Sequence, residues 1–188
     1  MILDETFFRR SATTVARALV GATLTIDGVG GIIVETEAYD RLDPASHSYG
    51  GKTERNASMF GPAARAYVYR SYGVHWCLNF VTHNTRIGGA VLIRALEPTD
   101  GIAIMRARRG SEDVKLLCSG PGRLAQALGI TRDLDGCALD APPFRLAKPE
   151  GRLGIVTGPR IGISRAVKVP WRFGLKGSKF HSRRFPAP

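Results

Sequence analysis

Residues 31–48 combine an apolar run with alternating charged and aromatic positions, and they are the most informative stretch of the chain. The β-branched run Ile32–Val34 predicts a strand. Because strand side chains alternate between two faces, Glu35, Glu37 and Tyr39 are expected to share one face. Two carboxylates are costly on a buried face but suit a strand that runs into a cleft, where one could act as a general base. The alternative is that one glutamate faces solvent and the other pairs with an arginine.

The chain before this strand is predicted to form a helix and a hairpin. Apolar residues between Ser11 and Gly21 recur at helical spacing, with Ser11 as the N-cap and Gly21 as the stop. Residues 22–26 predict a strand, and Asp27-Gly28 predicts the turn that leads into the strand of the two glutamates.

Two later segments carry candidate binding residues. Residues 40–64 predict a long loop, of a kind that is usually functional, and it contains His47, which is either solvated or part of a site. Residues 66–82 predict two strands joined by a tight turn at 70–73. Tyr72 falls at this turn, where it is either a wedge that enters a stack of nucleic-acid bases or a ring that folds back onto the domain.

Arg94 interrupts a strongly apolar strand predicted over 88–96. A cation in such a strand needs an anionic partner. Glu37 and the nearby Glu97 are the two alternatives.

The second half of the chain is predicted to be helical and then strongly basic. Helices are expected over 101–109, with Asp100 near its cap, and over 119–128, with Gly129 as the stop. The free N–H groups at the start of the second helix, together with Arg123, favour a phosphate. Apolar alternation over 160–164 predicts a strand. No acidic residue follows Glu150, whereas the segment from Arg160 to Arg184 carries eight Lys or Arg.

Composition indicates one domain and a polyanionic partner. The chain has 188 residues, enough for one domain with a core, and a net charge of +11, which makes nucleic acid the first candidate. Its three widely spaced cysteines predict reduced thiols, and no signal peptide or membrane span is expected. The sequence has no P-loop, dinucleotide fingerprint or metal-spaced histidine pair, so no metal or nucleotide cofactor is predicted. The expected location is the cytoplasm or nucleoid, or the nucleus of a eukaryote.

An ordered series of motifs resembles the alkyladenine (3-methyladenine) DNA glycosylases. The resemblance covers almost the whole chain, from the first helix to about Lys179. The motifs are VETEAY (34–39), HS (47–48), GGKTERN (50–56), MF (59–60), YVYRSYG (67–73), CLN (77–79), RALEP (94–98), CSGPGRL (118–124) and RIGI (160–163). So many blocks in one order make the match specific, although each block alone is weak.

The resemblance implies an α+β fold: a single compact domain spanning residues 1–188, with a curved, mostly antiparallel, partly open barrel-like sheet flanked by helices. It also implies a monomeric, monofunctional enzyme that flips a damaged purine out of double-stranded DNA and hydrolyses its N-glycosidic bond. In this sequence Glu37 corresponds to the general base, and Arg94 and the carbonyl of Ile161 would help hold the attacking water. The resemblance also implies that Tyr39 and His47 form one wall of the base pocket and Tyr69 the other, that Asn79 sits against the purine and rejects a 2-amino group, and that Tyr72 is the wedge. The basic character of the chain favours four residues as phosphate contacts: Arg70, Arg123, Arg165 and Lys176.

Some features depart from the family pattern or leave other functions open. The interval from Glu37 to His47 is one residue shorter than expected, and His75-Trp76 replaces an expected aromatic pair. One rival function is a non-catalytic nucleic-acid-binding module, in which Glu37 is structural. Another is a bifunctional glycosylase/lyase, which would need a lysine nucleophile such as Lys52 in the pocket.

Overall fold

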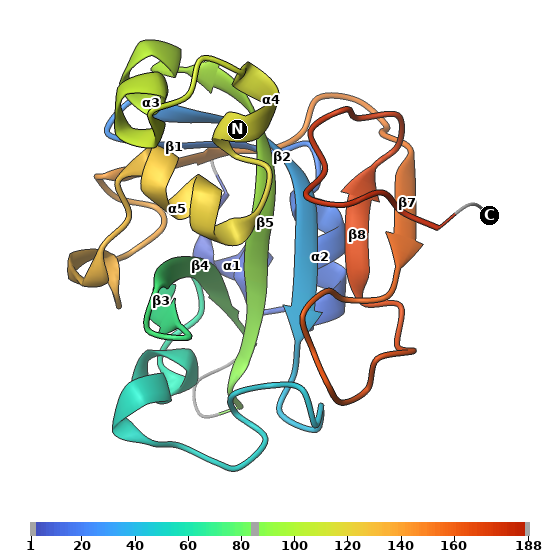
Figure 1. Ribbon diagram of the computed structural model, residues 1–188. Coiled ribbons are helices and arrows are strands. Elements are labelled where there is room, and N and C mark those ends of the chain that lie inside the picture. The colour runs from blue at the N-terminus through green and yellow to red at the C-terminus, as the bar shows by residue number, and fades with distance from the viewer. Residues whose placement is uncertain (1–2, 84–86, 187–188) are drawn as a thin grey trace.

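The computed structural model describes residues 3–83 and 87–186 of the chain (Figure 1). Along the chain the helices, 3-10 helices and strands are α1 (Glu5–Phe8), α2 (Ala12–Leu19), β1 (Thr23–Ile26), β2 (Val29–Tyr39), η1 (Glu54–Phe60), β3 (Ala66–Ser71), β4 (His75–Thr82), β5 (Gly89–Asp100), α3 (Ile102–Arg109), α4 (Val114–Leu117), α5 (Pro121–Leu128), η2 (Arg132–Leu134), β6 (Phe144–Ala147), β7 (Ile155–Gly158) and β8 (Arg172–Leu175). None of the helices in these described ranges is long and apolar enough to cross a bilayer.

One antiparallel sheet organises the fold. Its main path runs β3-β4-β5-β2-β1-β6, while β8 pairs with β2 and β7 pairs with β8. The long strand β2 therefore lies at the centre, paired with β1, β5 and β8. Helices α1 and α2 lie behind the sheet and α3, α4 and α5 lie in front of it (Figure 1). The predicted α+β class with a curved, mostly antiparallel sheet is confirmed.

Local sequence rules explain the elements that precede β2. The Ser11 hydroxyl accepts a hydrogen bond from the N–H of Thr14 and so caps α2, as the sequence predicts. Helix α2 buries Val15, Ala16 and Leu19 in the core. Thr36 of β2 donates its hydroxyl to the carbonyl of Ala16, which ties this helix to the central strand.

Three register shifts interrupt the pairing of β2 with β5, one at Gly30/Gly31 and two on either side of Glu35. Ile33 lies opposite Leu96 and Glu35 opposite Ala95, so Val34 is an extra residue on β2. Thr36 then lies opposite Ile93, so Arg94 is the extra residue on β5. Such bulges bend a strand and redirect a side chain, and they are frequent beside active sites.

Several predicted boundaries differ from the structure. Residues 160–164 form no strand, because Arg160 is buried in an ion pair and the residues after it turn toward a pocket. Strand β5 continues past Leu96 to Asp100, because pairing with β2 extends that far. Helix α3 begins at Ile102 and not at Gly101, because Gly101 is its N-cap, in the left-handed conformation with φ +65°, and Asp100 lies next to this cap.

Candidate active site

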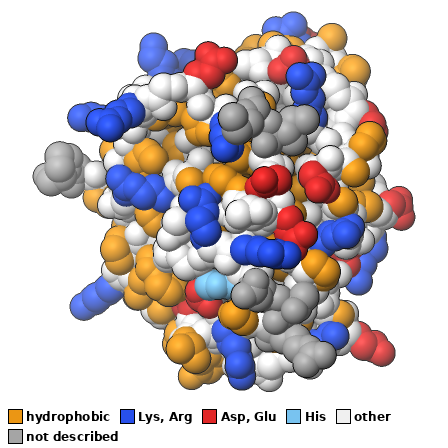
Figure 2. Space-filling view, turned by 180° about the vertical axis from the view of Figure 1, so that it is seen from behind, with side chains coloured by type: hydrophobic (Ala, Val, Ile, Leu, Met, Phe, Trp, Pro, Cys, Tyr) orange, Lys and Arg blue, Asp and Glu red, His pale blue; other side chains and the backbone are white. Residues whose placement is uncertain are grey.

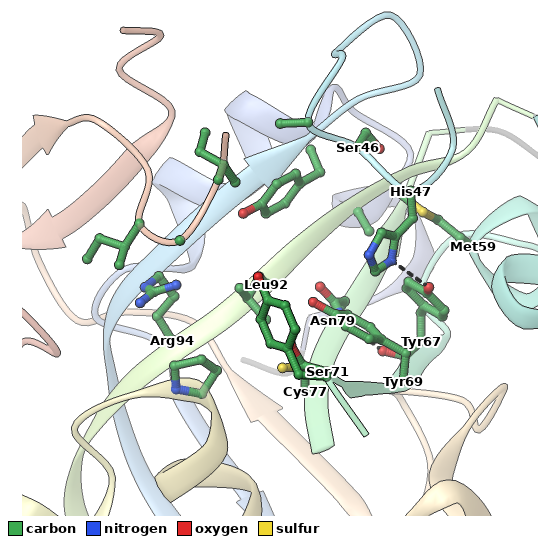
Figure 3. Close-up of a pocket in the computed structure, with 18 of the residues that line it drawn as sticks. Ser46, His47, Met59, Tyr67, Tyr69, Ser71, Cys77, Asn79, Leu92 and Arg94 are labelled. Atoms are coloured by element: carbon green, nitrogen blue, oxygen red, sulfur yellow. Dashed lines mark hydrogen bonds between the residues drawn. The ribbon is translucent and has the colours of Figure 1, made fainter. Parts of the chain in front are cut away.

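A pocket of about 840 Å³ opens where the end of β2, the β3–β4 hairpin, β5 and the segment 161–165 meet (Figure 3). Its wall contains Tyr39, His47, Tyr69, Asn79 and Arg94. The sequence predicts these five as site residues, and the fold brings them together from four separate segments. Ile161, Tyr72 and Arg165 also line the pocket.

Glu37 lies directly behind this wall and is fully buried. Its Oε1 accepts a hydrogen bond of 2.7 Å from the N–H of Ile161. Its Oε2 accepts one of 2.7 Å from the Tyr39 hydroxyl and lies 3.3 Å from Nη1 of Arg94. All three partners line the pocket, so the buried carboxylate is bonded directly to groups of the pocket wall. The contact of Ile161 with Glu37 is made by its N–H and not by its carbonyl.

Arg94 pairs with both glutamates of β2. Its Nε donates to Oε1 of Glu35 at 3.0 Å, in addition to the contact with Glu37. Both carboxylates are fully buried, so the alternative in which one glutamate faces solvent is wrong. Glu97, the other partner considered for Arg94, makes no ion pair with it; of the two, the partner is Glu37.

The aromatic part of the wall is a connected cluster. The His47 and Tyr69 rings meet edge to face with centroids 4.5 Å apart, and Tyr67 stacks on Tyr69 at 5.5 Å. Nδ1 of His47 is 2.9 Å from the Tyr67 hydroxyl (Figure 3). The resemblance implies that His47 and Tyr69 form opposite walls, whereas the structure places them in contact. Asn79 donates its amide to the carbonyl of Tyr67 at 3.1 Å.

Burial sets the protonation of this cluster. Desolvation, followed by the charge of Arg55, lowers the pKa of His47, so the imidazole is neutral at pH 7. Desolvation also raises the pKa of Tyr39 and Tyr69, and the charge of Glu37 adds to both shifts. The rings are therefore neutral, and the pocket presents uncharged π faces to a ligand.

Tyr67 and Cys77 also line the pocket, although neither is among the site residues predicted from the sequence. Both lie on the β3–β4 hairpin, where Tyr69 is the register partner of Cys77. The signal for Tyr67 is present in the sequence, because Tyr67 and Tyr69 share a strand face. The signal for Cys77 is that it opens the CLN motif at 77–79, although its spacing matches no metal or redox site.

Tyr72 projects from the β3–β4 turn and is 91% exposed. Its backbone is left-handed with φ 49°, which the turn imposes on a non-glycine residue. The alternative in which this ring folds back onto the domain is wrong. A large exposed ring on a strained, narrow turn at the mouth of a pocket is free to contact a partner.

The predicted phosphate-binding residues lie in different places. Arg165 lines the pocket mouth, and Arg70, exposed on the hairpin, approaches the Trp76 ring at 5.7 Å. Arg123 is exposed on α5, two residues after Pro121, which lines the pocket. Lys176 follows β8, donates its N–H to the carbonyl of Gly154, and does not line the pocket.

A buried ion pair fixes the loop that carries His47. Both Nη atoms of Arg160 donate to the Asp43 carboxylate, and Nη1 also donates to the carbonyl of Ala38. The guanidinium lies 4.7 Å from the centre of the Tyr39 ring and 5.3 Å from that of Trp171. Residues 38–43 are thereby tied to the segment that precedes Ile161.

Within the described ranges, no group of three or more His, Cys, Asp or Glu side chains is arranged to hold a metal ion. The pocket instead contains a buried carboxylate–arginine pair and a set of neutral rings. In a strongly basic chain, this arrangement is typical of an enzyme that acts on a polyanionic substrate.

Comparison with known proteins identifies the family. Residues 6–179 match the model of the methylpurine-DNA glycosylase family. A relative from Nitrosospira multiformis is 61% identical over 181 residues, which is 96% of this chain and 94% of the relative. Another from Rhodopseudomonas palustris strain BisB18 is 62% identical over 187 residues, 97% of this chain and 92% of the relative. A third from Agrobacterium fabrum is 59% identical over 183 residues, 97% of this chain and 93% of the relative. Each bears the name "Putative 3-methyladenine DNA glycosylase".

The chain therefore belongs to the methylpurine-DNA glycosylase family. The predicted resemblance is confirmed. So is the prediction of an enzyme class, a hydrolase of N-glycosyl bonds in alkylated DNA that serves DNA repair.

Proposed function

We propose that this chain is a monomeric, monofunctional glycosylase, with residues 1–188 as one domain, acting in the cytoplasm or nucleoid. It flips alkylated or deaminated purines out of double-stranded DNA and hydrolyses their N-glycosidic bond. The observation that carries the proposal is the Glu37 carboxylate, held by Arg94 and Ile161 behind an aromatic pocket. A base-release panel on duplexes that contain 3-methyladenine, 7-methylguanine, ethenoadenine or hypoxanthine tests it, and release of none of them would contradict it.

Glu37 is the general base of the proposed reaction. The bond between C1′ and the purine nitrogen breaks with its electron pair leaving on the purine, and C1′ gains oxocarbenium character. A water adds to C1′ and gives its proton to Glu37, whose charge also stabilises the developing cation. Arg94 and the carbonyl of Ile161 hold that water. In the structure the Tyr39 hydroxyl donates a hydrogen bond to Oε2 of Glu37. The attacking water therefore binds next to a carboxylate that already accepts this hydrogen bond.

The extruded base binds in the pocket with Tyr39 on one side and Tyr69 on the other, and His47 packs against Tyr69. Neutral rings suit a cationic alkylated purine through cation–π attraction, and a neutral His47 avoids repelling it. Asn79 also lines the pocket and donates its amide to the carbonyl of Tyr67. We assign to Asn79 the exclusion of a guanine-type 2-amino group.

Replacing Tyr72 by alanine is expected to weaken base flipping and leave folding nearly unchanged. The side chain is almost fully exposed, so little packing is lost. Without the ring nothing fills the gap that the flipped nucleotide leaves, and stacking on an aromatic side chain contributes about 1–3 kcal/mol per base. Single-turnover base release should therefore fall about 10- to 100-fold on a paired lesion, and less on a mispaired lesion that unstacks more easily.

Tyr49→Ala is the matched control for Tyr72→Ala. Tyr49 is also an exposed tyrosine, but it does not line the pocket. The Tyr49→Ala variant should release bases at the parent rate. A Tyr72→Ala variant that flips and cuts like the parent would remove Tyr72 from the mechanism, as would one that unfolds.

Binding to DNA is expected to depend steeply on salt. Each neutralised phosphate contributes about −0.9 to the slope of log affinity against log salt concentration. Replacing Arg70, Arg123, Arg165 or Lys176 by glutamine should therefore make the slope shallower by about 0.9 per true contact. Titrations of fluorescent duplex DNA at several salt concentrations measure this slope.

Arg17→Gln is the control for these variants. Arg17 is exposed on α2, behind the sheet, and on that face basic side chains are intermingled with acidic ones (Figure 2). For Arg17→Gln, the slope of log affinity against log salt concentration should equal that of the parent. A nearly flat affinity of the parent between low and physiological salt would exclude DNA phosphates as the main source of binding energy.

The two rival functions predict different results. A non-catalytic module would bind DNA and release no base. A glycosylase/lyase would form a Schiff base that borohydride traps, which needs a lysine at the reacting carbon. No lysine is among the described residues that line the pocket, and Lys52 is exposed outside it. These placements support the monofunctional proposal.

A further inference from the structure

The guanidinium of Arg94 contacts two carboxylates and a serine hydroxyl. One terminal nitrogen faces Glu37, Nε donates to Glu35, and Nη2 donates to the hydroxyl of Ser182 at 3.3 Å. The contact with Glu37, at 3.3 Å, is longer than the one with Glu35, at 3.0 Å. The position of Arg94 relative to Glu37 therefore depends on what holds its other two nitrogens.

Glu35 holds the Nε end of the Arg94 guanidinium. Its Oε1 accepts hydrogen bonds from Nε of Arg172 at 2.7 Å and from the Ser182 hydroxyl at 2.8 Å, in addition to Arg94. Its Oε2 accepts one from the N–H of Ser182 at 2.5 Å. Burial alone would raise the pKa of Glu35, but the charges of Arg94 and Arg172 and the bonds from Ser182 outweigh it and lower that pKa. Glu35 thus stays ionised, and the cluster has two carboxylates and two guanidinium groups.

The C-terminal segment 178–186 brings Ser182 to this cluster across 147 positions of sequence. Arg172 also donates to the carbonyl of Arg183 and lies 3.9 Å from the centre of the Phe185 ring. The same ring covers Gly174 of β8, where an added Cβ would stand 2.4 Å from it, so a side chain there would displace the segment. The family match ends at residue 179, before Ser182.

We propose that Ser182 and Glu35 are positioning residues of the glycosylase reaction, which hold Arg94 in place against Glu37. This inference rests on the proposed function, because it needs Glu37 as the base. Ser182 is suited to the task since its hydroxyl accepts from Arg94 and donates to Glu35, which links cation and carboxylate in one geometry. Loss of the hydroxyl leaves Arg94 free to turn toward Glu35 and away from Glu37.

The test compares Ser182→Ala in two backgrounds. In the parent enzyme, single-turnover base release should fall about tenfold, as expected when a hydrogen bond to a charged group is lost. In the Glu37→Gln background, Ser182→Ala should cause no further fall, because residues that act as a unit are not additive. Affinity for lesion DNA should stay within about twofold, and Ser182→Thr, which restores the hydroxyl, should return to near the parent rate.

Ser178→Ala is the matched control, since Ser178 lies in the same segment and its hydroxyl bonds only the N–H of Phe180 among the described residues. It should keep the parent rate. If Ser182→Ala does not fold, Ser182→Cys, which keeps the size but has a weak donor, replaces it with the same expectations. A parent-like rate, or an equal tenfold fall in both backgrounds, would overturn the positioning role. Failure of the proposed function looks different, because the parent enzyme would then release no base. Failure of Glu37 as the base would leave Glu37→Gln at the parent rate.

Discussion

Replacing Glu37 by glutamine is expected to lower the single-turnover rate of base release by at least about 100-fold. The amide is nearly isosteric, and its oxygen can still accept the hydrogen bond from the N–H of Ile161, while its NH2 group replaces the oxygen that accepts from Tyr39 and faces Arg94. It cannot accept the proton of the attacking water, and it has no negative charge to face the cation that develops on the sugar. Affinity for lesion DNA should be retained or improved, because a negative charge near the phosphates is removed. Rates at saturating enzyme and titrations of labelled duplex measure the two quantities.

Glu97→Gln is the matched control for Glu37→Gln. Glu97 is a carboxylate on the neighbouring strand β5 that lines no part of the pocket and forms no ion pair in the described part of the chain. Its rate should equal that of the parent. Glu35 is unsuitable as a control because it shares Arg94 with Glu37. Comparable rates for the Glu37 variant and the parent would remove Glu37 from the mechanism.

Local rules account for the parts of the fold that the sequence predicts. Ser11 caps α2 because a serine hydroxyl satisfies a free N–H, and the run Ile32–Val34 forms β2 because β-branched side chains suit a sheet. The tight turn forms where the sequence predicts it, because Gly73 readily adopts the left-handed backbone conformation that the turn requires. Five predicted site residues lie on β2, β3, β4 and β5, which are neighbours in one antiparallel sheet, and this brings them together. They are Glu37, Tyr39, Tyr69, Asn79 and Arg94.

Tertiary contacts decide the parts that the sequence does not predict. The alternation around Arg160 suggests a strand, yet the ion pair with Asp43, 117 positions away, fixes an irregular segment instead. The bulge at Arg94 depends on pairing between β2 and β5, which has no signature in either strand alone. The different surroundings of Glu35 and Glu37 likewise have no signature in the strand pattern, although the VETEAY motif singles out Glu37. They arise because Ser182 and Arg172 approach one carboxylate, whereas Ile161 and Tyr39 approach the other.

These contacts give the two glutamates separate environments only two residues apart. Glu35 faces a closed cluster supplied by β8 and the C-terminal segment, while Glu37 is held by residues that line the pocket. Arg94 joins the two environments. The segment that contains Arg160 and Ile161 closes the arrangement, because it holds the start of the His47 loop through Arg160 and Glu37 through Ile161.

Arg160→Met is therefore expected to produce the largest loss of stability among single substitutions around the pocket. Methionine keeps the length of the side chain but leaves the Asp43 carboxylate, which is 1% exposed, without its cation. Removing one partner of a buried ion pair typically costs about 3–5 kcal/mol, because the remaining charge is neither hydrated nor paired. The carbonyl of Ala38 also loses its donor, so residues 38–43 and the Tyr39 wall should loosen together.

Urea unfolding followed by tryptophan fluorescence measures the loss, and two further variants test its cause. Adding Asp43→Asn to Arg160→Met should recover most of the free energy of unfolding, because the second change removes the unpaired buried charge. Arg9→Met breaks the exposed pair with Glu5 and should change stability by less than about 1 kcal/mol. Equal losses from Arg160→Met and from Arg9→Met would show that burial does not set the strength of the Arg160–Asp43 pair. If Asp43→Asn deepens the loss, the cost lies in the missing packing of Arg160 on Tyr39 and Trp171 and not in the charge of Asp43.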